Sequence, residues 1–292
     1  MLEKERVKRW VETDFTLFNQ MLGGGVPEGK IIEIYGFEGC GKTTLALELS
    51  KYFKSVFYID YEHELDLEYV EKIGAKIKNI IQPISFEEGV DEIFHEFKEG
   101  KRYDLIIIDT IGSAITNEQI KKDISEATMG SLAQKVTIFL RKAEKILKPM
   151  NVTIILLNHK KDLFGAGFGE QHYTPGGRQI KFSASVRLSI TQKKDTIFDD
   201  SIITNIWVKK NKVISYNAIQ NCFYTIRRGM GIIKGEESFR LGTELNIIKK
   251  EGQSFSIGSK KFCGKKEMID FLNISEEVRK HINEKWYKKD KN

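Results

Sequence analysis

The sequence predicts an α/β fold in which a largely parallel central sheet is covered by helices and continues into an antiparallel extension. Apolar, β-rich runs without polar alternation lie between helical patterns in the first half of the chain. Such runs are typical of strands buried on both faces of a parallel sheet. Later strand-like runs follow one another without intervening helices, which favours an antiparallel continuation of the sheet. A small α+β unit is expected to end the chain.

The elements can be placed along the chain from these patterns. Strands are expected over residues 31–35, 56–60, 105–109, 152–158, 186–191, 202–208 and 223–226. Helices are expected over residues 43–53, 67–73, 86–99 and 130–147, and the last of these stops before Pro149. After residues 229–231 the pattern breaks, and helices are expected near 266–272 and 275–286. We therefore predict a core over residues 1–233, with a short N-terminal segment, and a small basic C-terminal domain over residues 234–292.

The composition is that of a globular protein. Of the 292 residues, 40% are hydrophobic and 30% are charged, which a disordered chain would not show. No apolar run approaches the roughly 18 residues of a membrane span, and the charged N-terminus lacks the apolar stretch of a secretory signal. The three cysteines are odd in number and widely spaced, which favours reduced thiols in a cytoplasmic protein without a membrane partner. Of the net charge of +6, residues 234–292 contribute +4, from 14 Lys+Arg and 10 Asp+Glu.

A phosphate-binding loop follows the first expected strand. The pattern G-x-x-x-x-G-K-[ST] is matched in full by Gly36, Phe37, Glu38, Gly39, Cys40, Gly41, Lys42 and Thr43. Backbone N–H groups of such a loop and the following helix N-terminus form a positive concavity for phosphate oxygens. There Lys42 reaches the β- and γ-phosphates and the Thr43 hydroxyl binds Mg²⁺, so ATP and Mg²⁺ are the expected cofactors. A chance match in a glycine-rich turn is the alternative.

Acidic residues at two other strand ends complete the expected site. Asp109 ends a buried strand and is expected to hold the Mg²⁺ through water, although an aspartate in a turn or helix cap is the alternative. Hydrolysis also needs a group that orients the attacking water. The strand over residues 56–60 brings Asp60, Glu62 and Glu64 to the same edge of the sheet. Spacing alone does not choose among these three acids, and a solvated loop carboxylate is the alternative for each.

These motifs together resemble bacterial RecA recombinases. The resemblance is carried by GFEGCGKTTL from Gly36, FYIDYEHELD from Phe57, DLIIID from Asp104, PGGRQIKFSASVRL from Pro175 and KKNK from Lys209. The motifs follow the family's order and spacing from Val11 to Trp286. The resemblance implies a RecA-like P-loop ATPase core with a small C-terminal domain. It also implies an ATP-dependent, single-stranded-DNA-binding recombinase that promotes homologous pairing and strand exchange in DNA recombination and repair.

The resemblance assigns roles around the nucleotide. It implies that Glu62 positions the attacking water, that Thr44 belongs to the nucleotide loop, and that Asp66 and Tyr69 contact adenine. His159 stands where many family members carry a glutamine that senses the γ-phosphate. A histidine can still donate a hydrogen bond there from one tautomer.

The resemblance also implies assembly. Lys210 and Lys212 match lysines that reach the γ-phosphate bound to the neighbouring subunit. A cation supplied in this way makes hydrolysis conditional on assembly. We expect a homo-oligomer, a helical filament, with nucleotide at the subunit interface. A lysine face on an exposed edge strand is the alternative. Compared with the family, few residues precede Trp10, and the acidic C-terminal tail is absent.

Two segments are expected to bind DNA. Residues 160–178 hold five glycines, three aromatic rings and three basic residues; glycine lets the backbone approach phosphates, and aromatic rings stack on bases. The resemblance makes this segment the second DNA-binding loop, for which a flexible surface loop is the alternative. It makes residues 117–129 the first DNA-binding loop. The expected contacts are Met129, Gly130, Arg141, Phe164, Phe168, Gly176, Gly177 and Arg178. Single-stranded DNA is the expected first partner. Duplex DNA is expected at the basic run over residues 260–266, where a solvated lysine face is the alternative.

Two other classes of function stay open at this point. One is an accessory protein with a RecA core, for example a phage-encoded one, that anneals or loads single strands without exchanging them. The other is a ring-forming motor such as a DnaB-type helicase, which the second loop and the C-terminal unit disfavour.

Overall fold

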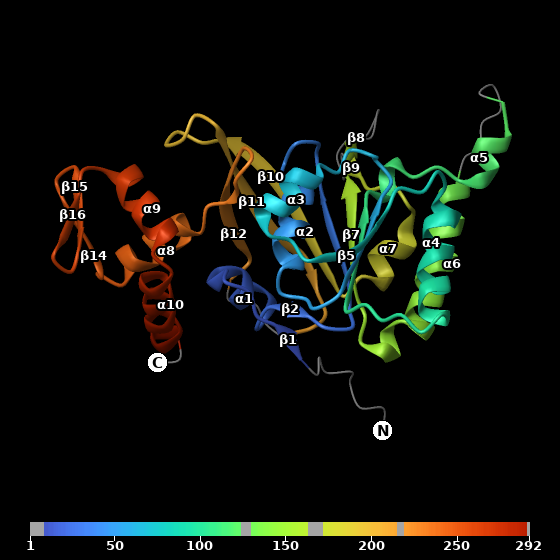
Figure 1. Ribbon diagram of the computed structural model, residues 1–292, viewed down its shortest axis with the longest axis horizontal. Coiled ribbons are helices and arrows are strands. Elements are labelled where there is room, and N and C mark those ends of the chain that lie inside the picture. Colours follow the sequence, from blue (N-terminus) through green and yellow to red (C-terminus); the bar gives the residue numbers. More distant parts are fainter. Residues whose placement is uncertain (1–8, 124–129, 163–171, 215–218, 291–292) are drawn as a thin grey trace.

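The central sheet has the predicted mixed character (Figure 1). The computed structural model describes residues 9–123, 130–162, 172–214 and 219–290. Within these residues, nine strands form one sheet in the order β13-β12-β11-β10-β3-β7-β6-β4-β5. The parallel part consists of β3 (Ile31–Gly36), β4 (Val56–Asp60), β5 (Ile77–Ile81), β6 (Leu105–Asp109), β7 (Thr153–His159) and β10 (Val186–Lys194). The antiparallel part consists of β11 (Ser201–Asn211), β12 (Asn221–Arg227) and β13 (Gly231–Ile232). The predicted fold class is confirmed.

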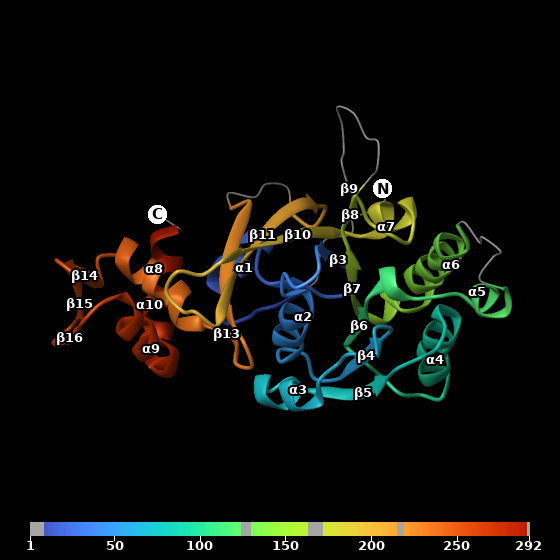
Figure 2. The same cartoon turned by 90° about the horizontal axis from the view of Figure 1, so that it is seen from above.

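Helices cover both faces of this sheet, as Figures 1 and 2 show. One face packs against α1 (Thr16–Leu22), α2 (Lys42–Ser50) and α3 (Leu67–Ile73). The other packs against α4 (Phe86–Lys98), α6 (Ser131–Ile146) and α7 (Arg178–Ser183). Alternate residues of one strand enter the two cores: Ile107 lies in the first and Ile106 in the second. Strands β4, β6 and β7 end in Asp60, Asp109 and His159, whereas β3 and β10 hold the ion pair between Glu33 and Arg187 within the sheet.

Several short elements were not predicted from the sequence. They are β1 (Trp10–Val11), β2 (Val26–Pro27), α5 (Asn117–Lys121), β8 (Lys161–Asp162), β9 (His172–Tyr173) and the 3₁₀ turns Ile111–Ser113 and Lys148–Met150. Helix α1 and the edge strand β5 were also missed. The predicted helix over residues 43–53 is shorter, because residues 51–53 form turns after α2. None of the described helices is long and apolar enough to cross a membrane.

The C-terminal part of the chain is a mixed unit beside β12 (Figure 1). It consists of α8 (Lys234–Glu244), β14 (Ile248–Glu251), β15 (Ser254–Ile257), β16 (Lys260–Phe262), α9 (Lys265–Ile274) and α10 (Glu276–Asp290). Helices α9 and α10 lie where the sequence predicts them. Phe239 and Leu272 of this unit belong to the same hydrophobic cluster as α1 and α2. The boundary between residues 233 and 234 stays a prediction.

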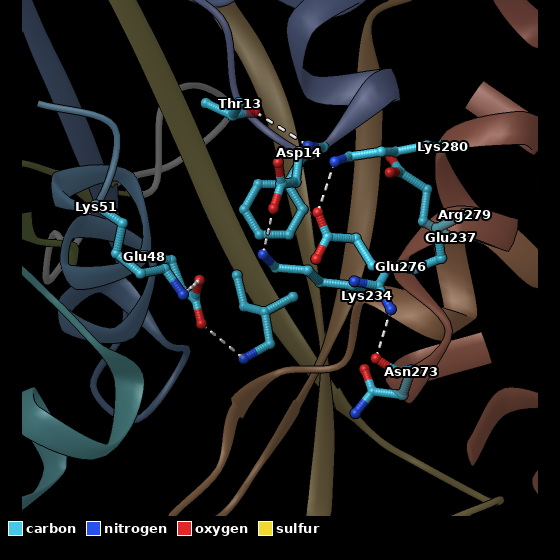
Figure 3. Close-up of polar contacts among 12 residues, drawn as sticks. Thr13, Asp14, Glu48, Lys51, Lys234, Glu237, Asn273, Glu276, Arg279 and Lys280 are labelled. Atoms are coloured by element: carbon cyan, nitrogen blue, oxygen red, sulfur yellow. Dashed lines mark hydrogen bonds and ion pairs between the residues drawn. The ribbon is translucent and has the colours of Figure 1, made fainter. Parts of the chain in front are cut away.

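A buried carboxylate joins the C-terminal unit to the first helix. Glu237 of α8 accepts hydrogen bonds from the backbone N–H groups of Thr16 (3.0 Å) and Leu17 (2.9 Å). Helix α1 has no N-terminal side-chain cap of its own, so Glu237 supplies one from a distant part of the sequence. Beside it, Lys234 pairs with Asp14 at 2.5 Å (Figure 3). Burial raises the pKa of Glu237 to about 7, although the two N–H donors act in the opposite direction.

This raised pKa predicts a pH-dependent stability. Because the folded protein holds the Glu237 proton more tightly than the unfolded chain, the stabilisation is complete below about pH 4.5 and is lost as the pH rises to about 7. The difference in free energy of unfolding between the wild type and Glu237→Gln should therefore fall by up to about 3 kcal/mol between pH 4.5 and pH 8. Urea unfolding across this range measures it. Glu244→Gln, an exposed change in the same helix, should leave the profile unaltered; parallel profiles for Glu237→Gln would contradict the assignment.

Candidate nucleotide and DNA site

The parallel strands bring the predicted residues to one edge of the sheet. Strands β3, β7, β6 and β4 are neighbours and end at the same side. Their register pairs Gly36 with His159 and Asp60 with Asp109. The phosphate loop, the histidine and the two aspartates therefore occupy adjacent strand ends, as the sequence predicts.

The phosphate loop is closely packed around its own lysine. A Cβ atom at Gly36 would lie 2.4 Å from the carbonyl oxygen of Ile190, so only glycine fits there. Gly41 takes a left-handed conformation, with φ of 89°, at the start of α2. The Lys42 side chain is buried, and its Nζ donates to the carbonyl oxygens of Phe37 (2.9 Å) and Gly36 (3.4 Å). The ammonium group is thus held inside the concavity expected to receive phosphate.

The predicted metal residues contact each other. Asp109 Oδ2 accepts hydrogen bonds from Thr43 Oγ1 (2.7 Å) and Tyr58 OH (2.5 Å). Its other oxygen, Oδ1, is buried and accepts no hydrogen bond from the residues that the structure describes. Burial raises the pKa of Asp109 to about 6, against the lowering effect of the Tyr58 and Thr43 hydrogen bonds. A cation would satisfy both the free oxygen and the buried charge.

The donor set fits Mg²⁺ held together with phosphates. Within the described parts of the chain, no group of three or more His, Cys, Asp or Glu residues could hold a metal by itself. Mg²⁺ usually keeps several waters and binds through one or two protein oxygens plus substrate phosphates. Thr43 and Asp109 match that requirement.

Glu62 is held by three donors on one oxygen. Its Oε1 lies 2.6 Å from His159 Nε2, 2.9 Å from Ser113 Oγ and 2.9 Å from Thr110 Oγ1. The hydrogen bond from His159, which requires the proton on Nε2, is the largest cause that lowers the pKa of Glu62 to about 2. Ser113 and Thr110 were missed from the sequence, and only their position just after Asp109 could have suggested them.

The geometry also distinguishes Asp60, Glu62 and Glu64, the three acids among which spacing alone does not choose the water-orienting residue. Asp60 is buried, and its carboxylate accepts hydrogen bonds from three backbone N–H groups of residues 62–65 and from Gln82 Nε2. It therefore shapes the loop that carries Glu62. Glu64 is exposed. Among the three, Glu62 is the acid that contacts other residues of the strand edge.

The predicted adenine residues lie beside α2. Asp66 caps α3 by accepting hydrogen bonds from the backbone N–H groups of Glu68 (2.9 Å) and Tyr69 (3.1 Å). Tyr69 OH lies 2.9 Å from Thr44 Oγ1. These contacts place Tyr69 against the phosphate-loop helix, and the contact with adenine stays a prediction.

Lys210 and Lys212 are docked on α7. Lys210 Nζ donates to the carbonyl oxygens of Lys181 and Phe182, and Lys212 Nζ donates to that of Phe182 at 3.3 Å. Carbonyl groups at the end of a helix lack partners within the helix. Burial, followed by the neighbouring charge of Lys212, lowers the pKa of Lys210 to about 8.

Four of the described DNA-binding candidates, Gly130, Gly176, Gly177 and Arg178, lie at two helix starts, whereas Arg141 lies in the second half of α6. Gly130 and Gly177 immediately precede α6 and α7, and a Cβ atom at Gly177 would lie 2.9 Å from Ala133 Cβ in α6. The two helices therefore begin side by side. Gly176 is buried in the turn before Gly177, whereas the side chains of Arg141 and Arg178 are exposed. Met129, Phe164 and Phe168 lie outside the described residues.

Comparison with known proteins agrees with this architecture. Residues 3–232 match the family model described as the RecA N-terminal domain. Protein RecA of Staphylococcus carnosus is 33% identical over 280 residues, covering 92% of this chain and 78% of that protein. Protein RecA of Ruminococcus albus is 32% identical, covering 93% and 71%, and that of Streptococcus gordonii is 34% identical, covering 89% and 72%.

The fold and the strand-edge site have the features of the class of nucleotide-binding α/β proteins. Within that class, the chain belongs to the RecA family. The predicted resemblance is confirmed, and with it a recombinase role in recombination and repair. Membership also supports an ATPase that binds nucleotide and DNA.

The contact between Tyr58 and Asp109 can be tested through Mg²⁺. Tyr58→Phe removes a donor that favours the ionised carboxylate, so the pKa of Asp109 should rise above about 6. More Mg²⁺ should then be needed for nucleotide binding, and the deficit should be larger at pH 6 than at pH 8. Titration of Mg²⁺ at a fixed ATP concentration measures this. Tyr103→Phe is the matched control, because Tyr103 OH also donates to a carboxylate, Glu96, at 2.5 Å. An equal deficit at both pH values would contradict the argument.

Proposed function

We propose that the protein is an Mg²⁺- and DNA-dependent ATPase that binds single-stranded DNA, then duplex DNA, and exchanges strands as a homo-oligomer. The observation that carries this proposal is the convergence of Lys42, the Thr43–Asp109 pair and Glu62 at one strand edge. Residues 160–178, the predicted DNA loop, leave from the end of β7 at that same edge.

Each residue of the strand edge has a role in the proposed hydrolysis. Lys42 exchanges its two carbonyl partners for phosphate oxygens, which are stronger acceptors because they are charged. Thr43 and Asp109 would hold Mg²⁺, which would offset the negative charge of the phosphates. Glu62 orients the attacking water. His159, which is bonded to Glu62, is proposed to donate to a γ-phosphate instead.

DNA binding is proposed at the adjoining starts of α6 and α7. The backbone N–H groups of Gly130, Gly176 and Gly177 are proposed to bind phosphate oxygens, and the exposed side chains of Arg178 and Arg141 add positive charge. Such contacts carry no base recognition, so binding should tolerate any sequence. ATP strengthens this binding if the DNA prefers the ATP-bound arrangement of the loops.

Two substitutions at the nucleotide site test the function. Lys42→Ala should abolish nucleotide binding, nucleotide-stabilised DNA binding and strand exchange together. Glu62→Gln should keep nucleotide binding but lower ATP hydrolysis by roughly 10²- to 10⁴-fold and lengthen the lifetime of DNA complexes, because only the attacking water loses its partner. Glu64→Gln is the matched control and should behave as wild type.

Strand-exchange, annealing and hydrolysis assays on these proteins separate the candidate functions. Hydrolysis by Glu62→Gln at the wild-type rate would show that Glu62 is misassigned. Annealing without exchange by the wild type would favour an accessory protein over a recombinase.

Assembly through the nucleotide can be tested by mixing variants. If Lys210 and Lys212 act on a neighbour's nucleotide, their joint replacement by alanine should lower hydrolysis by roughly 10³- to 10⁵-fold, the range of such cations. Mixing this variant with Glu62→Gln should restore part of the activity, because one mixed interface has both intact groups. Lys209→Ala, an exposed neighbour on β11, should have no such effect. Turnover independent of protein concentration, without rescue on mixing, would contradict the proposal.

A further inference from the structure

Three charged side chains form a row across the sheet beside α7. The strand register pairs Lys210 of β11 with Arg187 of β10, and Arg187 with Glu33 of β3. Residues directly opposite each other on neighbouring strands project to the same face of the sheet. That face is the one covered by α7, because Lys210 Nζ donates to carbonyl oxygens of this helix. Figure 2 shows the three strands side by side. Arg187 therefore lies between a lysine and a carboxylate.

A bulge in β11 determines which lysine joins this row. The pairing of β10 with β11 shifts between Arg187 and Leu188, and Lys209 is the extra residue in β11. Bulges of this kind redirect side chains and are common next to active sites. The side chain of Lys209 is exposed, whereas that of Lys210 is partly buried against α7. The bulge thus brings Lys210 rather than Lys209 opposite Arg187.

The carboxylate of Glu33 is buried and has two partners. Its Oε2 lies 2.5 Å from Arg187 Nε, and its Oε1 accepts a hydrogen bond from Asn158 Nδ2 at 3.2 Å. The guanidinium group of Arg187 also lies over the ring of Tyr35, with its Cζ 4.7 Å from the ring centroid. A buried ion pair is often no more stabilising than an apolar pair of similar volume. Stability of the sheet alone therefore does not explain why a charged pair occupies this place.

Lys210 is close enough to compete for the same carboxylate. Two strand spacings, roughly 10 Å, separate the backbones of Lys210 and Glu33 across β10. The flexible stem of a lysine and the side chain of a glutamate can together cover such a separation. Burial, and then the charge of Lys212, are the largest causes that lower the pKa of Lys210 to about 8. Arg187 also lowers this pKa, whereas Glu33 acts in the opposite direction. Lys210 is thus attracted by Glu33 and repelled by Arg187.

We propose that Arg187 is a positioning residue: it occupies the Glu33 carboxylate and repels Lys210, and so keeps the Lys210 ammonium group available to the nucleotide of the neighbouring subunit. Without Arg187, Glu33 would draw Lys210 into an ion pair within its own subunit. A carboxylate holds an ammonium group more strongly than the carbonyl oxygens of α7 do, so fewer lysines would reach across the interface. The inference rests on the proposed function, because it assumes that Lys210 acts on a neighbour's nucleotide.

The first test measures ATP hydrolysis by the full chain with Mg²⁺ and oligo(dT). Arg187→Met removes the cation but keeps a side chain of similar length, and it should lower kcat about tenfold or more. Glu33→Gln/Arg187→Met also removes the competing carboxylate and should return kcat to within about threefold of wild type. An arginine with a merely structural role predicts no such rescue, because the second substitution cannot restore packing that the first removed.

A matched control and a second substitution make this comparison secure. Arg227 also pairs with a carboxylate, that of Asp200 at 2.8 Å, and lies over an aromatic ring, that of Phe198. Arg227→Met should therefore hydrolyse ATP at the wild-type rate. Thermal unfolding shows whether each variant is folded. If Arg187→Met does not fold, Arg187→Gln replaces it in both proteins, because the glutamine amide can still donate a hydrogen bond to Glu33.

The second test measures the pKa of Lys210 in the chain without nucleotide. The pH-dependent reaction of each lysine with acetic anhydride, followed by peptide mass spectrometry, gives this value. Arg187→Met should raise the pKa of Lys210 by about one unit or more, because a repelling cation is lost and a carboxylate becomes accessible. Glu33→Gln/Arg187→Met should reverse most of this rise.

The two tests distinguish failure of the inference from failure of the proposed function. Equal kcat values for Arg187→Met and Glu33→Gln/Arg187→Met, or an equal pKa of Lys210 in both, would overturn the inference and leave the proposed function intact. Hydrolysis by Lys210→Ala/Lys212→Ala at the wild-type rate would overturn the role of Lys210 in the proposed function. The pKa comparison would then still decide whether Arg187 keeps Lys210 away from Glu33.

Discussion

The parallel alignment of β3, β7, β6 and β4 is the constraint from which the site follows. These strands are buried on both faces, so their interiors hold few groups that water or phosphate could reach. Chemistry is therefore confined to the strand ends, and parallel strands end at one edge. Gly36, His159, Asp109 and Asp60 become neighbours because of this register. The antiparallel extension then adds β11, which carries Lys210 and is followed directly by Lys212.

Asp60, Glu62 and Asp109 lie at one edge of the sheet, where their carboxylates repel one another. The structure stabilises each of the three in a different way. Asp60 accepts hydrogen bonds from backbone N–H groups and becomes part of a turn. Glu62 is stabilised as a carboxylate by three donors, which hold its pKa low. Asp109 keeps a buried oxygen without a donor among the described residues, and its pKa is raised. Only Asp109 would gain strongly from a cation, which is the property expected of a metal ligand.

The sequence predicts those parts of the site that are encoded by residues adjacent in the chain. The phosphate loop is a contiguous pattern, and Asp109 follows an unbroken apolar run, so both could be predicted. The contact between Glu62 and His159 joins residues 97 positions apart, and no local pattern in the sequence predicts it. Strands β14–β16 were missed because they are short and lysine-rich. The cap that Glu237 provides for α1 depends on packing between distant helices, which a single sequence does not encode in any local pattern.

Lys42 and Lys210, two cations of the proposed reaction, both donate hydrogen bonds to backbone carbonyl oxygens in the isolated chain. Lys42 is held by carbonyl oxygens of the phosphate loop, and Lys210 by those at the end of α7. Within the described residues, neither is paired with a carboxylate. A carbonyl dipole keeps an ammonium group in place but binds it more weakly than an anion does. A phosphate can therefore displace these partners without first breaking an ion pair. In the proposed reaction, the nucleotide of the same subunit would release the carbonyls of the phosphate loop. The nucleotide of the neighbouring subunit would release those of α7, which begins at the end of the predicted DNA loop over residues 160–178.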